Sequence, residues 1–530
     1  MSPKKKKKTK PKPLDLKLTL ENFGPLRKAE IDLKPLTIFI GPNNSGKTYV
    51  ATMFYSLWKA LQIVSVYAVM PARVLRIREK ASHQFSFSAD PSGAEWFKSY
   101  DAFLKSLAPD LIAFGDGGLD IAGFLSRFFP KLLDDQQELL RKNIAGQIGT
   151  SFSTKGSDLA RSGQKRFQLL CRTRHLDLKY DSGSDVGEIR IGGNEKLLHA
   201  LVAENKLSSI CDRIKAVAND KHEADLAHDE EIAFLLAHLA RTAQFGFWHD
   251  FLEAFGEERR RLHKREFHYL PAPRSALLEV YKPLVSGVFR QMGEAGHERS
   301  EIPTITGVTS NFMTFLTHLP QPEGPFAKME IQMSDDLIQG RIVLEVAHPN
   351  LPPTFLYEFE GGKIPLYRAS SSVSELAPLF LYLRYAIKPG DALIIDEPEA
   401  HLHPANIRVL AKYLVKLVRE GVNLIITTHS DYLFGQINNY ILRGELRAKR
   451  FKEKSDDLPD VYLNHDEVGA YLFKRDNRIK KGTAYRTEEL EVTEEGFSEQ
   501  EFVKVSHAMY DELVDLRRQI DPKEYLDDEW

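Results

Sequence analysis

The sequence predicts an α/β fold in which helices flank a mixed β-sheet. Three short apolar runs, residues 36–40, 392–395 and 422–427, are rich in β-branched residues, which is typical of buried parallel strands. They end in a glycine-rich loop, an acidic pair and a Thr-His-Ser segment, respectively. Ligands bind at the carboxyl ends of the strands in open α/β sheets, so we expect these polar segments to share one ligand-binding edge.

The first run leads into a phosphate-binding motif. The glycines, lysine and threonine of GPNNSGKT have P-loop spacing between an expected strand and an expected helix. Glycines let backbone N–H groups surround a triphosphate, the lysine reaches its β and γ oxygens, and the threonine hydroxyl binds Mg²⁺. The start of the helix adds positive potential. We therefore predict a triphosphate site formed by Gly41, Pro42, Asn43, Asn44, Ser45, Gly46, Lys47 and Thr48, with Thr48 on the metal.

The acidic pair after the second run supplies further groups for phosphoryl transfer. We expect Asp396 to be the distal carboxylate for Mg²⁺ and Glu397 to polarise an attacking water. His401 and His403 would share one face of a strand, as zinc ligands do. No cysteine or third ligand is near them in the sequence and proline follows at once, so a loop beside the phosphates is the favoured interpretation.

The third run places a histidine at the same edge of the sheet. His429 follows the expected strand directly, so its imidazole should lie near Asp396. In a second interpretation His429 is a bystander, and Ser430 or Asp431 caps the next helix. The two interpretations are compatible.

In this order, GPNNSGKT, LIIDEPEAHLHP and IITTHS resemble the Walker A motif, the Walker B motif with D-loop, and the H-loop of ABC-type ATPase heads. The opening LTLENFGPLRKAEIDLKPLTIFIGPNNSGKT is similar to the overcoming-lysogenization-defect and chromosome-maintenance branch, not to transporters. The resemblance covers residues 14–63 and 267–440. It implies ATP and Mg²⁺ as cofactors, ATP hydrolysis with Glu397 and His429 as catalytic residues, and a homodimer or higher homo-oligomer whose heads enclose ATP.

The segment before Walker B departs from the family pattern. Where the resemblance implies a signature loop, the chain has a serine cluster followed by an amphipathic helix pattern. We expect Ser371 and Ser372 to contact the γ-phosphate held by a neighbouring subunit. The alternative is simple helix capping, with Glu375 completing a capping box from Ser372. No glutamine is assigned to a Q-loop, and Arg274 is open to interpretation as a phosphate, interface or surface residue.

The remaining chain suggests several further parts. The middle segment has helical apolar spacing and one alternating strand pair, but no sustained heptads, which favours a mainly helical insert with an antiparallel β arm over a coiled coil. The segment TEEGFSEQEFVKVSH resembles the start of a fused Toprim nuclease, but too little chain follows Glu501 to build that domain, so we expect any cutting to belong to another polypeptide. The expected parts are a basic tail (1–13), the N-terminal half of the head (14–63), the insert (64–266), the C-terminal half of the head (267–440) and a C-terminal extension that forms an interaction surface (441–530).

The composition indicates the surface charge and the cellular compartment that we expect. The formal net charge of −2 argues against a surface that is basic throughout. Two cysteines in 530 residues are too few for a disulfide scaffold and indicate a reducing compartment. The sequence shows no bilayer-spanning run and no signal-peptide core, so we expect no membrane association and a cytoplasmic location.

The resemblance extends to the ATPase subunits of the Septu and PARIS antiphage defence systems. It implies an ATPase that dimerises on ATP and controls a separate effector, a nuclease or toxin, with DNA or a phage protein as trigger. One alternative is a DNA-repair or chromosome-organising ATPase that binds DNA directly, although the lack of a long coiled coil counts against it. Another is a nucleotide-sensing scaffold without turnover, which the presence of Glu397 opposes.

Overall fold

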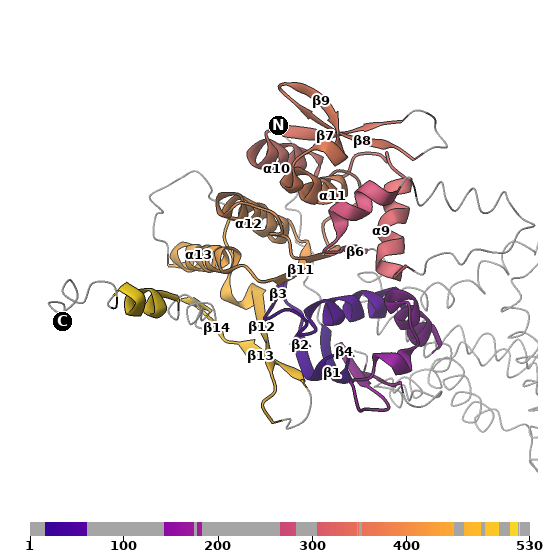
Figure 1. Ribbon diagram of the computed structural model, residues 1–530, viewed down its shortest axis with the longest axis vertical. Helices are drawn as coiled ribbons and strands as arrows, with labels where there is room; N and C mark the ends of the chain where they lie inside the picture. The colour runs from indigo at the N-terminus through magenta and orange to yellow at the C-terminus, as the bar shows by residue number, and fades with distance from the viewer. Residues whose placement is uncertain are drawn as a thin grey trace, which may run out of the picture. The chain divides into compact units, whose positions relative to one another are not determined.

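The computed structural model is drawn in Figure 1. It describes residues 16–60, 142–173, 177–182, 265–281, 283, 305–346, 348, 352–449, 461–478, 483–497, 509–517 and 519. The basic tail (1–13) and most of the expected insert (64–266) therefore lie outside the described residues. Within the described residues, no helix has the length and apolar character needed to cross a membrane.

A ten-stranded mixed sheet forms the centre of the fold (Figure 1). Its order is β5-β4-β1-β2-β13-β12-β3-β11-β10-β6, and the last five strands run parallel to one another. Strands β1 and β2, like β12 and β13, pair antiparallel. The strand bounds are β1 Leu16–Phe23, β2 Leu26–Asp32, β3 Leu36–Ile40, β4 Gln168–Thr173, β5 Asp177–Asp181, β6 Phe267–Leu270, β10 Ala392–Asp396, β11 Asn423–Thr428, β12 Val468–Arg475 and β13 Tyr485–Leu490.

The three apolar runs form adjacent parallel strands, as the sequence predicts. Every residue of β3, β10 and β11 is buried, because helices cover this region of the sheet. Strand β11 begins and ends one residue later than expected. The expected strand pair in the middle segment is confirmed as β4 and β5.

Amphipathic helices complete the core around the parallel strands. In α12 (Pro404–Arg419), Ile407, Leu410, Leu414 and Leu417 are buried at the three- and four-residue spacing of one helix face. Each such side chain stabilises the fold by about 1.5–3 kcal/mol through burial. Further helices are α9 Gly307–Thr317, α10 Ala327–Ile338, α11 Ser371–Tyr385 and α13 Asp431–Ala448. Figure 1 shows α12 and α13 side by side.

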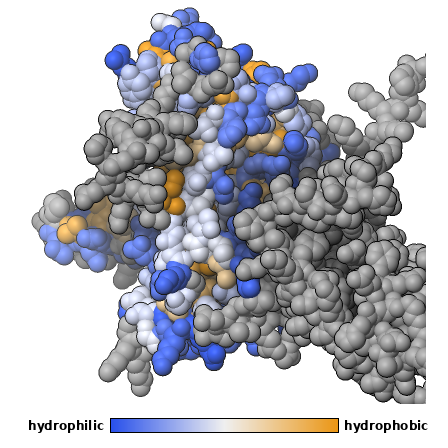
Figure 2. Space-filling view, turned by 90° about the vertical axis from the view of Figure 1, so that its right-hand side faces the viewer, coloured by the Kyte–Doolittle hydropathy of each residue, from blue (hydrophilic) through white to orange (hydrophobic). Residues whose placement is uncertain are grey.

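The second expected strand group forms a separate three-stranded antiparallel sheet. Its strands are β7 (Gly340–Glu345), β8 (Thr354–Phe359) and β9 (Gly362–Pro365), which lie at the top of Figure 1. A short segment then leads from β9 to the serine cluster at the start of α11. The described surface in Figure 2 is largely hydrophilic or neutral, with apolar residues in small separate patches.

The segment after residue 440 differs from the expected extension. Strand β12 lies between β3 and β13 in the central sheet, and its first six residues are buried. Helix α13 also continues across the expected boundary to Ala448. Because β12 pairs with β3 through backbone hydrogen bonds and buries its apolar side chains there, β12 and its neighbour β13 contribute to the head itself.

The chain divides into two compact units. The first comprises residues 1–57, 148–169 and 264–530, and the second comprises residues 58–147 and 170–263. All three polar segments predicted to share a ligand-binding edge belong to the first unit.

Candidate functional site

The loop of residues 41–46 connects β3 to a helix whose described residues are 47–60. Gly41 and Gly46 have φ angles of 143° and 101°, which residues with a side chain rarely adopt. A Cβ on Gly41 would lie 2.4 Å from the carbonyl oxygen of Phe473 in β12, and one on Gly46 would lie 2.9 Å from Cγ of Leu26. Both positions therefore require glycine, partly because strands from distant parts of the chain approach the loop closely.

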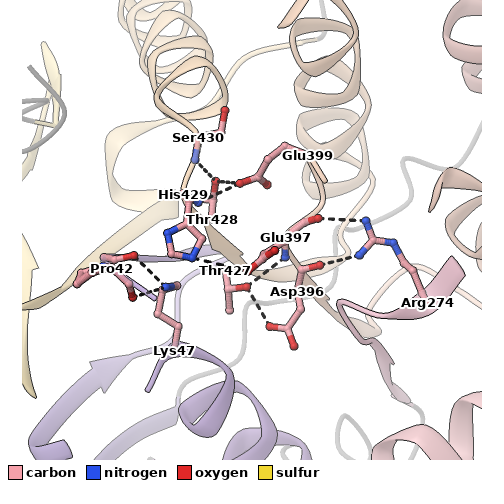
Figure 3. Close-up of polar contacts among 11 residues, drawn as sticks. Pro42, Lys47, Arg274, Asp396, Glu397, Glu399, Thr427, Thr428, His429 and Ser430 are labelled. Atoms are coloured by element: carbon pink, nitrogen blue, oxygen red, sulfur yellow. Dashed lines mark hydrogen bonds and ion pairs between the residues drawn. The ribbon is translucent and has the colours of Figure 1, made fainter. Parts of the chain in front are cut away.

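Lys47 extends back over this loop. Its Nζ donates hydrogen bonds of 2.9 Å to the carbonyl oxygens of Gly41 and Pro42 (Figure 3). Burial lowers the pKa of Lys47 to about 8, and nearby acidic side chains partly oppose this shift. The ammonium group thus lies between the loop backbone and the acidic edge of the sheet.

The other loop residues differ in exposure. Ser45 is buried, and its Oγ has no hydrogen-bond partner among the described residues. Thr48 is exposed in the first turn of the helix. The remaining exposed residues of the predicted triphosphate site are Pro42, Asn43 and Asn44.

Asp396 ends β10 as a buried carboxylate. Tyr269 in β6 donates a hydrogen bond of 2.7 Å to Oδ2, and Thr427 in β11 donates one of 2.9 Å to Oδ1. Burial raises the pKa of Asp396, while the hydrogen bonds from Tyr269 and Thr427 oppose that shift. Tyr269 was not predicted from the sequence, because only the pairing of β6 with β10 brings it to Asp396.

Glu397 and His429 face each other across the edge of the sheet (Figure 3). His429 Nε2 lies 3.6 Å from Glu397 Oε1, and both side chains are partly exposed. Burial lowers the pKa of His429 and Lys47 adds to this effect, whereas Glu397 opposes it. The expected juxtaposition of the second and third polar segments is present in the fold.

Glu399, in the turn after β10, fixes the loop that follows β11. Glu399 Oε1 accepts hydrogen bonds of 2.5 Å from Thr428 Oγ1 and 2.9 Å from the backbone N–H of His429. Burial raises the pKa of Glu399, and these hydrogen bonds oppose the shift. Glu399 therefore holds the backbone from which the His429 imidazole extends. This role was not predicted from the sequence, in which the only signal is an acidic residue two positions after Glu397.

Two helix caps lie near the site, one at the start of α12 and one at the start of α13. His403 is the N-cap of α12, and its Nδ1 accepts a hydrogen bond of 3.2 Å from the N–H of Ala405. Ser430 caps α13 by accepting a hydrogen bond of 3.2 Å from the N–H of Leu433. The capping interpretation of Ser430 is confirmed, and it coexists with the position of His429 beside Glu397. His401, in the turn before α12, has a φ of 59°.

Arg274 is a buried residue, so its interpretation as a surface arginine is wrong. Its side chain is 2% exposed and is directed at groups of its own chain. It donates hydrogen bonds to the carbonyl oxygens of Asp396 and Glu397 at 2.7 and 3.0 Å (Figure 3). The guanidinium also lies 3.2 Å from the carboxylate of Glu375.

The serine cluster lies at the start of α11. Ser370 is the N-cap residue without a side-chain capping bond, and its Oγ lies 3.0 Å from Oγ of Ser372. Ser371 is exposed and Ser372 is partly exposed. The capping box from Ser372 is wrong, because Ser372 lies inside the helix and the buried Glu375 carboxylate instead contacts Arg274 and Ser275.

Comparison with known proteins assigns the family. A family model described as "AAA domain, putative AbiEii toxin, Type IV TA system" matches residues 36–435. The chain belongs to this AAA-domain family. No curated protein matches it. Membership and the mixed sheet with flanking helices support the expected P-loop ATPase head, and the resemblance to Septu and PARIS subunits stays a prediction.

Three solved structures are similar to the AAA-domain chain. An Smc head bound to the C-winged helix domain of ScpA is 10% identical, with a TM-score of 0.31 and coverage of 90% of this chain and 97% of that chain. The SMC head domain from Thermotoga maritima is 11% identical, with a TM-score of 0.27 and coverage of 89% and 98%. An Smc head domain with an extended coiled coil, bound to the C-terminal domain of ScpA derived from Pyrococcus furiosus, is 10% identical, with a TM-score of 0.30 and coverage of 93% and 98%.

The donor set of the AAA-domain chain fits a nucleoside triphosphate with Mg²⁺. The first N–H groups of a helix lack intrahelical partners, and here they adjoin a buried lysine and the Ser45 hydroxyl, for which the described part of the chain offers no hydrogen-bond partner. Oxygen donors, which Mg²⁺ prefers, are present in Thr48 and Asp396. The loop and the start of its helix thus offer N–H and ammonium donors for phosphate, while Thr48 and Asp396 offer oxygen ligands for the metal.

Proposed function

We propose that the chain is an ATP-binding and ATP-hydrolysing ABC-type ATPase subunit. The observation that carries the proposal is the meeting of three segments at one sheet edge: the loop with Lys47, the turn with Asp396 and Glu397, and His429 after β11. The reaction converts ATP and water into ADP and phosphate. In this arrangement the loop binds the triphosphate on one side, and Glu397 reaches the edge as a partly exposed carboxylate.

Lys47 has the binding role in this proposal. Its ammonium exchanges the carbonyl oxygens of Gly41 and Pro42 for β- and γ-phosphate oxygens. A phosphate oxygen carries more negative charge than a peptide carbonyl, so this exchange strengthens the hydrogen bonds. The N–H groups at the start of the helix and the Ser45 hydroxyl bind further phosphate oxygens.

In this proposal Glu397 and His429 act on the attacking water. Glu397 orients and polarises the attacking water, and His429 restrains the carboxylate from 3.6 Å away. Mg²⁺ would be held by Thr48 and Asp396, where it would neutralise phosphate charge. Tyr269 and Thr427 keep the Asp396 carboxylate in place.

The assembly that we propose is an ATP-dependent homodimer or higher homo-oligomer. Ser371 and Ser372, at the exposed start of α11, contact the γ-phosphate bound by another copy. The dimer regulates a separate effector, a nuclease or toxin, in antiphage defence, with DNA or a phage protein as trigger. This part is supported by the resemblance of the motifs to Septu and PARIS subunits.

Phosphate release by the purified chain with ATP and Mg²⁺ tests hydrolysis. Glu397→Gln should lower the rate at least about 100-fold while ATP still binds, because the water loses its polarising carboxylate. Lys47→Ala should lose ATP binding itself. The exposed Glu420→Gln, at the end of α12, is the matched control and should behave as the parent. Equal phosphate release from Glu397→Gln and the parent would remove Glu397 from the reaction.

Phage challenge tests the biological role. Cells that express the chain with the product of its neighbouring reading frame should resist phage, and Lys47→Ala should abolish that resistance. Resistance from the chain alone would contradict a separate effector. Hydrolysis that DNA stimulates without any second protein would favour the DNA-organising alternative.

A further inference from the structure

A buried ion pair links the start of α11 to the turn that carries Glu397. Arg274 lies in the helix that follows β6, and Glu375 lies one turn beyond the serine cluster of α11. Their side chains are 2% and 4% exposed. We propose that Arg274 is a positioning residue that couples the start of α11 to the orientation of Glu397; this rests on the proposed ATP hydrolysis.

The turn at Glu397 has an unusual backbone conformation that its neighbours hold in place. Glu397 has a φ of 47°, a conformation that a non-glycine residue keeps only when its surroundings stabilise it. Its N–H donates to the carbonyl oxygen of Thr427 at 3.0 Å. On the other side, two nitrogens of Arg274 bind the consecutive carbonyl oxygens of Asp396 and Glu397. The strained turn is thus held from both sides, and the direction of the Glu397 side chain depends on Arg274.

The same guanidinium also contacts the first turns of α11. Arg274 Nε donates to the backbone oxygen of Glu375 at 3.0 Å and lies 3.2 Å from its carboxylate. Ser275 also donates a hydrogen bond to that carboxylate. A planar guanidinium suits contact with both elements at once, because its donors point in several fixed directions, whereas a lysine ammonium is a compact point charge. A shift of the first turn of α11 must therefore move Arg274 or break its contacts with the Glu397 turn.

The serine cluster gives this connection a role in hydrolysis. Ser371 and Ser372 precede Glu375 in the same helix and are the residues proposed to meet a neighbour's γ-phosphate. Contact at the start of α11 then reaches Glu397 through a single side chain. This arrangement would make the water-polarising group respond to the presence of a second head.

A chemically matched pair in the same helix offers a control. Arg384, near the end of α11, donates to the carboxylate of Glu330 in α10 at 2.9 and 2.5 Å. Glu330 is 1% exposed, and Arg384 also reaches the carbonyl oxygen of Ile342 at 3.4 Å. This pair resembles Arg274–Glu375 in chemistry and burial but joins α11 to α10 and β7, away from the Glu397 turn.

The test compares Arg274→Lys with Arg384→Lys. In Arg274→Lys we expect kcat to fall about 10-fold or more, since small misplacement of a reacting group has effects of that size. Affinity for a non-hydrolysable ATP analogue should change less than about 3-fold, because binding uses the loop and not the turn. Arg384→Lys should retain the parent kcat. Equal kcat in the two variants, or a loss of analogue binding that matches the loss of kcat, would overturn the proposal.

A second variant guards against a folding defect. Glu375→Gln removes the charge at the α11 end, leaves Arg274 in place and should also lower kcat with analogue binding retained. In the double variant with Arg274→Lys, kcat should be no lower than in Arg274→Lys alone, because both changes break one connection. The coupling would be overturned if the two single losses of kcat multiplied in the double variant, or if a folded Glu375→Gln kept the parent kcat. The parent is assayed first: no hydrolysis there would refute the proposed function itself.

Discussion

Tyr269 Oη donates a 2.7 Å hydrogen bond to Asp396 Oδ2 at the buried end of β10. The two residues lie on neighbouring parallel strands, with Tyr269 opposite Ile394. Removing the hydroxyl would leave a buried carboxylate oxygen without this donor, which favours the protonated, uncharged form of Asp396. A protonated carboxyl group is a poor ligand for Mg²⁺.

We therefore expect Tyr269→Phe to raise the Mg²⁺ concentration needed for half-maximal ATP hydrolysis by about 3- to 10-fold. The matched control is Tyr413→Phe, since Tyr413 donates a 2.8 Å hydrogen bond to Asp336 outside the site. Phosphate release measured over a Mg²⁺ series distinguishes the two. An unchanged Mg²⁺ requirement in Tyr269→Phe would show that the hydroxyl does not support the metal site.

The two histidine positions should differ in their effect on hydrolysis. His429 faces Glu397 at 3.6 Å, whereas His401 lies in the turn before α12. We expect His429→Ala to lower kcat about 10-fold or more and His401→Ala to change it less than about 3-fold. A larger loss of kcat in His401→Ala than in His429→Ala would place the catalytic groups nearer the turn that contains His401. Metal analysis of the purified chain should find no stoichiometric zinc, and stoichiometric zinc would revive the paired-histidine interpretation of His401 and His403.

Mixing experiments test whether the serine cluster acts across subunits. Ser372→Arg should leave ATP binding by the monomer intact but prevent ATP-dependent dimerisation and hydrolysis, because a bulky side chain blocks the start of α11. Mixed with Lys47→Ala, it should recover part of the hydrolysis, since the heterodimer has one intact loop facing one intact serine cluster. Parent-level hydrolysis by Ser372→Arg alone would show that the cluster only begins α11 and has no role across subunits. Size-exclusion chromatography with ATP measures the dimer.

The close approach of β12 to the loop predicts a difference between two glycines. Gly41 and Gly362 both have positive φ angles, 143° and 127°, but only Gly41 has a neighbour within 4 Å of the position of a Cβ. Alanine at either position strains the backbone, and Gly41→Ala must also move Phe473. We expect Gly41→Ala to lower the free energy of unfolding by about 1–3 kcal/mol more than Gly362→Ala does. Equal unfolding midpoints in denaturant would contradict the predicted clash.

The sequence determined the local features of the site. The apolar runs predict β3, β10 and β11 almost to the residue, and the loop that follows β3 is recognisable from the spacing of its glycines, lysine and threonine. These features could be predicted because periodicity and loop chemistry depend on neighbours within a few residues. The common edge of the sheet followed from the parallel direction of the strands.

Only the tertiary structure decided which distant residues support that edge. Arg274 contacts the Asp396 carbonyl from 122 positions away in the sequence, and Tyr269 contacts its carboxylate from 127 positions away. Likewise, β12 enters the sheet beside β3, so a segment expected outside the head forms part of its centre. Local sequence patterns carry no information about such pairings. They arise when the folded chain buries a polar group, which must then find a partner wherever the sheet order places one.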